Sequence, residues 1–392
     1  MSSLNQTPQG ERLHIGIFGR QNAGKSSLLN AVTGQNLAVV SSVKGTTTDP
    51  VFKAMELLPL GPVVFIDTPG IDDKGELGKL RTEKTKIILR KTDIALLIVD
   101  SAEGLSDDDK ELIKVFTEME IKHLVVYNKS DLVKNNLPDG FHVSATAGEN
   151  IDALKEKIAL LVGTETKTWP LVADLLNPGD VVVLVVPIDK AAPKGRLILP
   201  QQQVIRDILD AGAVSIITQE SEYANTLKTL KNPPKLVITD SQVFKLVSNE
   251  TPTDIDLTSF SILMARYKGV LEKSVSDVKS LDTIKDGDKI LISEGCTHHR
   301  QCDDIGTVKI PKWIEQYTGS KPLYEFSSGG GFPQDLSSYK IIVHCGGCML
   351  NSREMNYRYR AARDANVPIT NYGILISYMQ AILERCIAPF GK

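Results

Sequence analysis

The side chains best suited to metal chemistry lie near the C-terminal end of this 392-residue chain. Cys296 and His298 form one group, and His344, Cys345 and Cys348 form a second. Two cysteines separated by two residues can direct both thiolates at one metal centre. In a cytosolic protein, such a cysteine cluster indicates metal binding or redox chemistry before it indicates disulfides.

The spacing alone leaves three interpretations of these cysteines open. A zinc site of the Cys₃His type fits, and so does an iron–sulfur cluster held by three cysteines and a different fourth ligand. Reduced thiols in a protein core, with incidental histidines, are the third interpretation. Two cysteines stand apart: we interpret Cys302 as a bystander and Cys386 as a buried thiol on an apolar helix face.

A second constellation indicates phosphate binding. Gly19, Gly24, Lys25 and Ser26 match the phosphate-loop pattern of glycine, four residues, glycine, lysine and serine. Glycines let backbone N–H groups wrap around phosphates, and the start of the following helix favours negative charge. Lys25 is suited to neutralising the β- and γ-phosphates, and the Ser26 hydroxyl to binding Mg²⁺.

Motifs further along the chain complete a nucleotide site. The carboxylate of Asp67 suits Mg²⁺, and the N–H of Gly70 suits the γ-phosphate. The threonines at 46–48 resemble the first mobile switch of translation-factor-like GTPases, and Thr47 is our candidate for contact with Mg²⁺ and the γ-phosphate, with Thr46 next. We expect Lys25, Thr47 and Gly70 to act in catalysis.

The base is predicted to be guanine, so that the nucleotide is GTP. Asp131 can accept hydrogen bonds from the N1–H and the exocyclic amine of guanine, which adenine does not offer. We expect Asn128 to brace the phosphate loop and Lys129 to cover the base. The full set expected to bind nucleotide and Mg²⁺ is Gly19, Asn22, Ala23, Gly24, Lys25, Ser26, Ser27, Thr47, Asp67, Asn128, Lys129, Asp131, Ser144 and Ala145.

Two departures from other GTPases bear on the hydrolysis step. Many regulatory GTPases place a water-orienting glutamine directly after the glycine of the Asp-Thr-x-Gly motif, and here that position is Ile71, which cannot orient water. Asn22, inside the phosphate loop, resembles the asparagine of the potassium-activated subgroup of GTPases. We therefore expect slow hydrolysis that K⁺ stimulates.

These residues need strands and helices to position them. Apolar segments at Leu13–Phe18, Val63–Ile66, Ile94–Val99 and Leu124–Tyr127 read as strands buried on both faces. Helical patterns at Lys25–Thr33, Asp107–Met119 and Ile151–Val162 alternate with them, which predicts an open parallel sheet with helices on both sides.

The rest of the chain is predicted to form two more α/β regions. Further strands are expected at Val181–Val186, Val214–Thr218, Leu236–Ile238, Ile290–Ser293 and Tyr339–Val343, with long helices at Phe260–Val278 and Gly373–Cys386. The two cysteine motifs would then meet at neighbouring strand ends. The expected fold is α/β, with a GTP-binding domain at 1–166, an interaction domain at 167–280 and a cysteine-bearing domain at 281–392.

The composition fits a soluble globular protein, with 42% hydrophobic and 24% charged residues and a formal net charge of −3. This charge gives no sign of a basic surface for nucleic acid, so we expect no nucleic-acid partner. The N-terminal segment is polar, and the longest apolar run is too short to cross a bilayer. We therefore expect a cytoplasmic protein with no membrane partner.

A GTPase region followed by Cys-x-His, a long spacer and His-Cys-x-x-Cys resembles the HydF family, the maturation GTPases of FeFe-hydrogenase. The segment from Cys296 to Gly306 and the glycine run ending at Pro333 carry the same likeness, which extends over essentially the whole chain. The resemblance implies GTPase, dimerisation and cluster domains in that order, and a homodimer.

The resemblance also implies a four-iron four-sulfur (4Fe-4S) cluster held by Cys296, Cys345 and Cys348, with His298 and His344 as candidates for the fourth ligand or for hydrogen bonds around it. It implies a scaffold that receives a two-iron precursor made by the radical-SAM maturases HydE and HydG and delivers it to apo FeFe-hydrogenase. The alternative is a potassium-activated GTPase of the tRNA-modification or ribosome-assembly type with a structural zinc site.

Overall fold

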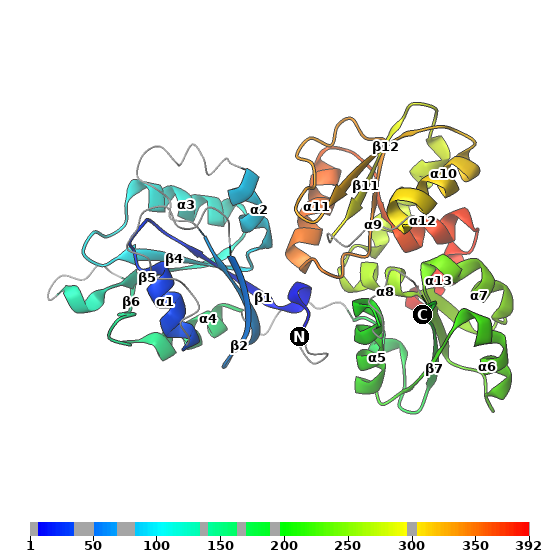
Figure 1. Ribbon diagram of the computed structural model, residues 1–392, viewed down its shortest axis with the longest axis horizontal. Coiled ribbons are helices and arrows are strands. Elements are labelled where there is room, and N and C mark those ends of the chain that lie inside the picture. Colours follow the sequence, from blue (N-terminus) through cyan, green and yellow to red (C-terminus); the bar gives the residue numbers. More distant parts are fainter. Residues whose placement is uncertain are drawn as a thin grey trace. The chain divides into compact units, whose positions relative to one another are not determined.

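The computed structural model describes residues 7–34, 51–68, 83–133, 140–162, 170–188, 197–295 and 304–391. The chain divides into two compact units, Met1–Lys167 and Thr168–Lys392 (Figure 1). Each unit is built from largely parallel β-sheet and helices, as the alternation of apolar and amphipathic segments predicted. No helix within the described ranges is long and apolar enough to cross a membrane.

The first unit contains a six-stranded sheet in the order β2-β3-β1-β4-β5-β6. Strand β2 is antiparallel to β3, and the remaining pairs are parallel. The prediction of an open parallel sheet with helices on both sides is confirmed, and the antiparallel edge strand β2 is an addition to the strands expected from the sequence. The strands are β1 (Leu13–Phe18), β2 (Val51–Leu57), β3 (Gly61–Asp67), β4 (Ile94–Asp100), β5 (Lys122–Asn128) and β6 (Phe141–His142).

Helices cover both faces of this sheet because its strands are apolar on both sides. Ile15 and Ile17 of β1 pack under α1 (Lys25–Thr33) and α4 (Ile151–Val162). Phe18, on the opposite face, packs under α2 (Glu83–Lys91) and α3 (Asp107–Glu118). Figure 1 shows the two helix pairs on opposite sides of the sheet.

The second unit contains two four-stranded sheets, and every strand pair in them is parallel. The first sheet has the order β10-β9-β7-β8, and the second the order β12-β11-β13-β14. The strands are β7 (Val181–Val185), β8 (Val214–Thr218), β9 (Leu236–Thr239), β10 (Asp256–Ser259), β11 (Lys289–Glu294), β12 (Leu323–Ser328), β13 (Ile341–His344) and β14 (Ile369–Asn371).

One continuous apolar core joins the two sheets of the second unit. It contains Val183 and Val237 of the first sheet together with Ile290 and Val343 of the second. The helices of this unit are α5 (Leu199–Asp210), α6 (Tyr223–Thr229), α7 (Phe244–Glu250), α8 (Phe260–Tyr267), α9 (Leu271–Asp277), α10 (Ile310–Thr318), α11 (Ser352–Asp364), α12 (Tyr372–Met379) and α13 (Leu383–Ile387).

Two long helices predicted from the sequence are broken in the structure. The segment Phe260–Val278 forms α8 and α9, separated at Gly269, whose φ of +71° lies in the left-handed region and cannot continue a helix. The segment Gly373–Cys386 likewise forms α12 and α13, separated at Ala381, whose φ is +56°. At each break, the apolar pattern continues because the helices before and after it pack against the same apolar core.

Candidate functional site

The phosphate loop connects β1 to α1, as its sequence predicts. Gly24 precedes the helix with a φ of +89°, in the left-handed region that favours glycine. A Cβ placed on Gly24 would lie 2.2 Å from Nδ2 of Asn128, so no larger residue fits without displacing that side chain. This close approach holds the loop against the Asn128 side chain, which comes from the end of β5.

Lys25 is buried and turned back onto the loop that precedes it. Its Nζ donates hydrogen bonds to the carbonyl oxygens of Gly19 and Arg20, each at 2.8 Å. Asp67 lies at the end of the neighbouring strand β3. Burial raises the pKa of Asp67, and the positive charges of Lys25 and Lys53 partly offset that rise. A bound cation would favour the charged carboxylate in the same way.

Asn128 joins three segments of the nucleotide unit. Its Nδ2 donates to the carbonyl oxygen of Ala23 at 3.1 Å, and its Oδ1 accepts from the N–H of Ala145 at 3.1 Å. The side chain is buried, and its backbone carbonyl accepts from the Ser101 N–H and hydroxyl. Asn128 therefore fixes the phosphate loop relative to the loop that holds Ser144 and Ala145.

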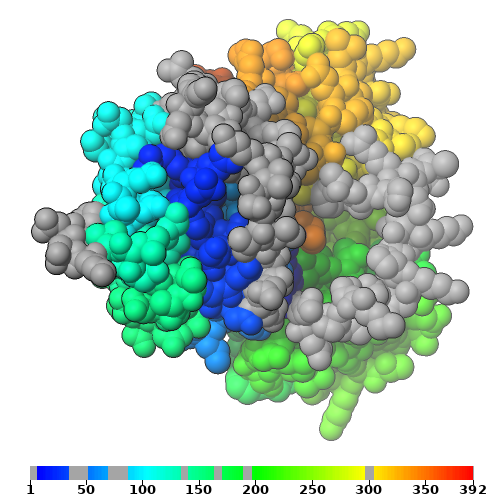
Figure 2. All heavy atoms as spheres, turned by 60° about the vertical axis from the view of Figure 1, so that its left-hand side comes forward, coloured from blue at the N-terminus to red at the C-terminus, as the bar shows by residue number. Residues whose placement is uncertain are grey.

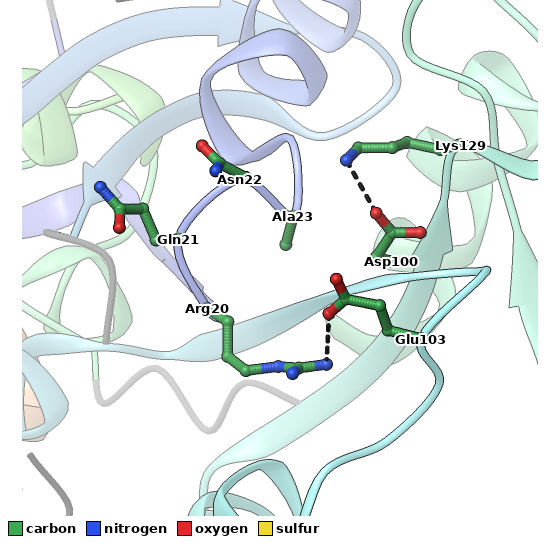
Figure 3. Close-up of a pocket in the computed structure, with 7 residues that line it drawn as sticks. All are labelled: Arg20, Gln21, Asn22, Ala23, Asp100, Glu103 and Lys129. Carbon is green, nitrogen blue, oxygen red and sulfur yellow. Dashed lines mark hydrogen bonds and ion pairs between the residues drawn. The ribbon is translucent and has the colours of Figure 1, made fainter. Parts of the chain in front are cut away.

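Lys129 is held in an ion pair at the mouth of a pocket next to the phosphate loop (Figure 3). Its Nζ lies 2.7 Å from Oδ2 of Asp100, the last residue of β4. Burial opposes ionisation of Asp100, but the hydrogen bonds from Lys129 and the Ala102 N–H outweigh it and lower the pKa of this carboxyl. Asp100 was not singled out from the sequence, although its position at a strand end next to the site was a usable signal.

A second ion pair in the same pocket involves Arg20 of the phosphate loop (Figure 3). Its guanidinium lies 3.0 Å from Glu103 and 3.5 Å from Asp109, and it donates to the Gly104 carbonyl at 3.2 Å. Asp109 is buried and also closes the capping box at the start of α3. Arg20 is thus engaged with the β4–α3 segment.

The remaining nucleotide residues divide between described and undescribed segments. Asp131 is exposed on a short 3₁₀ helix after β5, and Ser144 is buried after β6. Thr46, Thr47, Gly70 and Ile71 lie outside the described residues. Figure 2 shows the blue segment that carries the phosphate loop and α1 at the surface, beside cyan and green segments of the same unit.

The cysteine loop follows β13 in the second unit. Strands β11 and β13 are parallel neighbours, with Ser293 opposite His344, and the N–H of Cys345 donates to the Ser293 carbonyl at 2.9 Å. Cys296 and His298 lie just beyond Gly295 at the end of β11, outside the described residues, as does Cys302. The ends of the two strands that lead into the cysteine motifs are therefore side by side.

Backbone N–H groups converge on the sulfur of Cys345. The N–H of Gly295 donates to its Sγ at 3.1 Å and the N–H of Gly347 at 3.4 Å. Burial raises the pKa of the Cys345 thiol, and these two N–H groups act in the opposite direction. A metal centre would complete the stabilisation of the thiolate, because its positive charge favours the deprotonated sulfur.

Both ring nitrogens of His344 are engaged within the protein. Its Nδ1 lies 2.7 Å from the Cys345 carbonyl oxygen, and its Nε2 lies 3.0 Å from Nη1 of Arg358. Burial, followed by the charge of Arg358, lowers the pKa of His344 to about 3. The ring is therefore neutral, with Nδ1–H donating to the carbonyl and Nε2 accepting from Arg358, which leaves neither nitrogen directed at a metal in this arrangement.

Arg358 of α11 is fully buried, and sequence reasoning missed it. It forms an ion pair with Glu354 at 2.9 Å and donates to the Ser293 hydroxyl at 3.3 Å and to the Gly329 carbonyl. Gly329 begins the glycine run noted in the sequence. The available signal was a glutamate and an arginine four residues apart on the helix that directly follows His-Cys-x-x-Cys.

The residues present fit a metal centre bound by thiolates. The loop contains Cys345 and Cys348, the strand beside it leads to Cys296, and N–H groups already point at sulfur. No group of three or more possible ligands occurs among the described residues, which exclude 296–303.

Cys386 is fully buried in the apolar core as predicted, and burial raises its pKa to about 12.

Three protein families match successive parts of the chain. Residues 14–129 match the family described as 50S ribosome-binding GTPase. Residues 171–269 match the hydrogen maturase F dimerization domain, and residues 272–389 match the hydrogen maturase F tetramerization domain. The N-terminal unit is therefore a GTPase domain of the P-loop type, which takes GTP with Mg²⁺.

Two curated relatives each match between a third and two fifths of this chain. GTPase Der of Wolinella succinogenes is 38% identical over 165 residues, which are 37% of this chain and 35% of the relative. The tRNA modification GTPase MnmE of Streptococcus mutans is 35% identical over 154 residues, 38% of this chain and 33% of the relative. The chain thus spans about a third of the length of the curated relatives it matches.

Among solved structures, Aquifex aeolicus Era bound to GDP and AlF4⁻ matches with a TM-score of 0.34 and 21% identity, over 53% of this chain and 92% of that one.

Proposed function

This chain belongs to the hydrogen maturase F (HydF) family, and on that premise we propose that it is a hydrogenase-maturation GTPase and iron–sulfur scaffold. It receives the two-iron precursor of the hydrogenase active site and delivers it to apo FeFe-hydrogenase. The maturases HydE and HydG are the sources of that precursor. The domains are a GTP-binding domain at 1–166, a dimerisation domain at 167–280 and a cluster-binding domain at 281–392.

In the GTPase domain, GTP binds with its phosphates in the loop from Gly19 to Ser27 and Mg²⁺ on Ser26 and Thr47. Asn128 supports this role because it already joins the phosphate loop to the Ala145 segment. K⁺ binds beside Asn22 and supplies positive charge that Arg20, engaged with Glu103 and Asp109, does not supply. GTP hydrolysis acts as a switch of partner affinity.

In the cluster domain, Cys296, Cys345 and Cys348 hold the 4Fe-4S cluster. Held by three thiolates, the cluster supplies one iron with an exchangeable position at which an incoming complex attaches. Gly295 and Gly347 hold the Cys345 sulfur through their N–H groups. His344 orients the cysteine loop and does not bind iron, because its two ring nitrogens contact the Cys345 carbonyl oxygen and Arg358.

The observation that supports this proposal is the parallel pairing of β11 with β13, so that the ends of the two strands that precede the cysteine motifs are neighbours. The test is the iron and acid-labile sulfide content after anaerobic reconstitution, with EPR of the reduced protein. We expect about four irons and four sulfides per chain. Cys345→Ala and Cys348→Ala should lose them, while Cys386→Ala, a change at a core thiol outside the loop, should keep them.

Stoichiometric zinc without sulfide would overturn the scaffold proposal. The alternative would then be a potassium-activated GTPase of the tRNA-modification or ribosome-assembly type with a structural zinc site. The likeness of the GTPase domain to Der and MnmE is the observation that favours this alternative. Equal rates of GTP hydrolysis in KCl and NaCl would separately contradict the assignment of K⁺ to Asn22.

A further inference from the structure

The cysteine loop, residues 345–350, is anchored where it begins and where it ends. At its start, Arg358 holds His344, the last residue of β13, through a hydrogen bond of 3.0 Å. At its end, the Leu350 carbonyl oxygen accepts a hydrogen bond of 2.9 Å from Nζ of Lys268. The loop is followed at once by Asn351, whose side chain caps α11.

Lys268 does not come from the cysteine-bearing domain. It is the C-cap residue of α8, a helix that follows strand β10 of the first sheet of the unit. It lies inside the segment that matches the dimerization domain. The residue is 3% exposed, and the hydrogen bond that its ammonium group donates to Leu350 is buried. A buried ammonium is costly unless polar groups satisfy it, which makes the contact with Leu350 a strong constraint.

Helix α8 also lies against the middle of the loop. A Cβ placed on Gly346 would lie 3.6 Å from the Met264 side chain and 3.8 Å from the Ser261 hydroxyl. The start of α8 is fixed in turn, because the Ser261 hydroxyl accepts from the Gly373 N–H at 3.2 Å and Asn371 Nδ2 donates to the Ser261 carbonyl at 2.9 Å. One helix of the neighbouring domain therefore supports the loop and holds its end.

We propose that Lys268 is a positioning residue of the cluster site, supplied by the dimerisation domain, that fixes the conformation of the cysteine loop and places a buried positive charge beside it. This inference rests on the proposed cluster function. A cluster gains negative charge on reduction, and a fixed cation in a low-dielectric surrounding favours the reduced form. Lys268 thereby links the dimerisation domain to the redox behaviour of the cluster.

The test compares Lys268→Met, which keeps the length of the stem and removes the charge, with Lys268→Arg and the control Lys289→Met. Lys289 is a surface lysine on β11 whose ammonium pairs with Glu325 at 3.0 Å. Two quantities are measured: amide hydrogen exchange of residues 346–351 in cluster-free protein, and the midpoint reduction potential of the reconstituted cluster by EPR-monitored titration.

For Lys268→Met we expect loop amides that exchange about tenfold faster, since a charge-assisted hydrogen bond is lost, and a more negative potential. Lys268→Arg should restore both toward wild type, and Lys289→Met should change neither. A wild-type value of either quantity in Lys268→Met would overturn the proposal. If wild-type protein holds no iron and sulfide, the proposed function fails instead, and the exchange rates alone decide whether Lys268 fixes the loop.

Discussion

The ion pair between Lys129 and Asp100 fixes the position of the Lys129 side chain before a nucleotide binds. The residue after Asn128 has a φ of +62°, and its ammonium lies 2.7 Å from Asp100 at the end of the adjacent strand. This pair holds the Lys129 side chain in the lining of the pocket that the phosphate loop also lines (Figure 3). If Lys129 covers the base as we propose, holding its stem there lowers the conformational entropy that is lost when GTP binds.

We predict that Asp100→Asn weakens GTP binding by about threefold to tenfold, the range expected for a partly exposed ion pair with a strong hydrogen bond. Fluorescent-nucleotide titration measures this change. Asp107→Asn is the matched control, because Asp107 pairs with Lys110 at 2.9 Å on the surface of α3. Equal affinities for the Asp100→Asn variant and wild type would show that the pair does not prepare the site.

The same pair sets a pH dependence with a definite sign. The pKa of Asp100 is lowered in the folded protein, so its attraction to Lys129 is complete above the ordinary carboxyl pKa and is lost only as pH falls through the lowered value. This pair should therefore add no pH dependence to GTP affinity between about pH 6 and about pH 8. Affinity measured across that range in wild type and in Asp100→Asn should differ by a constant factor.

At the scale of the element, the conformation of the cysteine loop requires glycine at position 347, where a side chain would be strained and would clash. Gly347 has a φ of +64°, and a Cβ there would lie 2.5 Å from the Met355 sulfur. We predict that Gly347→Ala lowers the iron content after reconstitution by at least half, because the N–H that reaches Cys345 Sγ is displaced.

Gly319 provides a control for the backbone contribution in this experiment. Its φ is +67°, and a Cβ placed on it would meet nothing within 4 Å. Gly319→Ala therefore has a similar left-handed strain, about 1 kcal/mol, without a steric clash. Iron content should stay at the wild-type level in this variant, and an equal loss in both variants would attribute the effect to general instability.

A second element-scale prediction concerns β8, an edge strand of the first sheet in the second unit. Val214 and Ile217 of this strand are 48% and 46% exposed, and unpaired backbone groups on an exposed apolar edge favour pairing with another strand. The segment matches a dimerization domain. We predict that Ile217→Lys shifts the protein toward monomer in sedimentation, whereas Leu160→Lys, which changes an exposed leucine of the GTPase domain, does not.

Strand and helix periodicity explains what the sequence could predict and what it could not. Buried strands such as β1 and helices such as α4 were located to the residue, because uninterrupted apolar runs and helical spacing reflect packing directly. The breaks at Gly269 and Ala381 were missed because the core-facing pattern runs through them. Lys268 and Arg358 were missed because their roles come from contacts with residues 82 and 14 positions away.

At the scale of the whole molecule, the second unit has enough apolar core to fold without a metal. Ile290, Ile292, Ile341 and Val343, on the two strands that lead to the cysteine motifs, are all at most 1% exposed. We predict that the Cys345→Ala/Cys348→Ala variant unfolds cooperatively, with a melting temperature within about 4 °C of cluster-free wild type, which corresponds to roughly 1 kcal/mol in a unit of this size. Circular dichroism on heating measures it, and a molten second unit at 25 °C would contradict the prediction.

The two sheets of the second unit share one strand order. Numbered from the first strand of each, both read 2-1-3-4, all parallel, and each fourth strand leads into a helix capped by a polar side chain, Ser259 for α8 and Asn371 for α12. The sheet formed by β7–β10 achieves this with no cysteine between residues 171 and 270. The sheet of β7–β10 can therefore be compared with the sheet of β11–β14 as the same strand order without cysteines. Because the sheet of β7–β10 forms this architecture without thiolates, we expect the sheet of β11–β14 to keep its fold when Cys345 and Cys348 release the metal centre that we propose they bind.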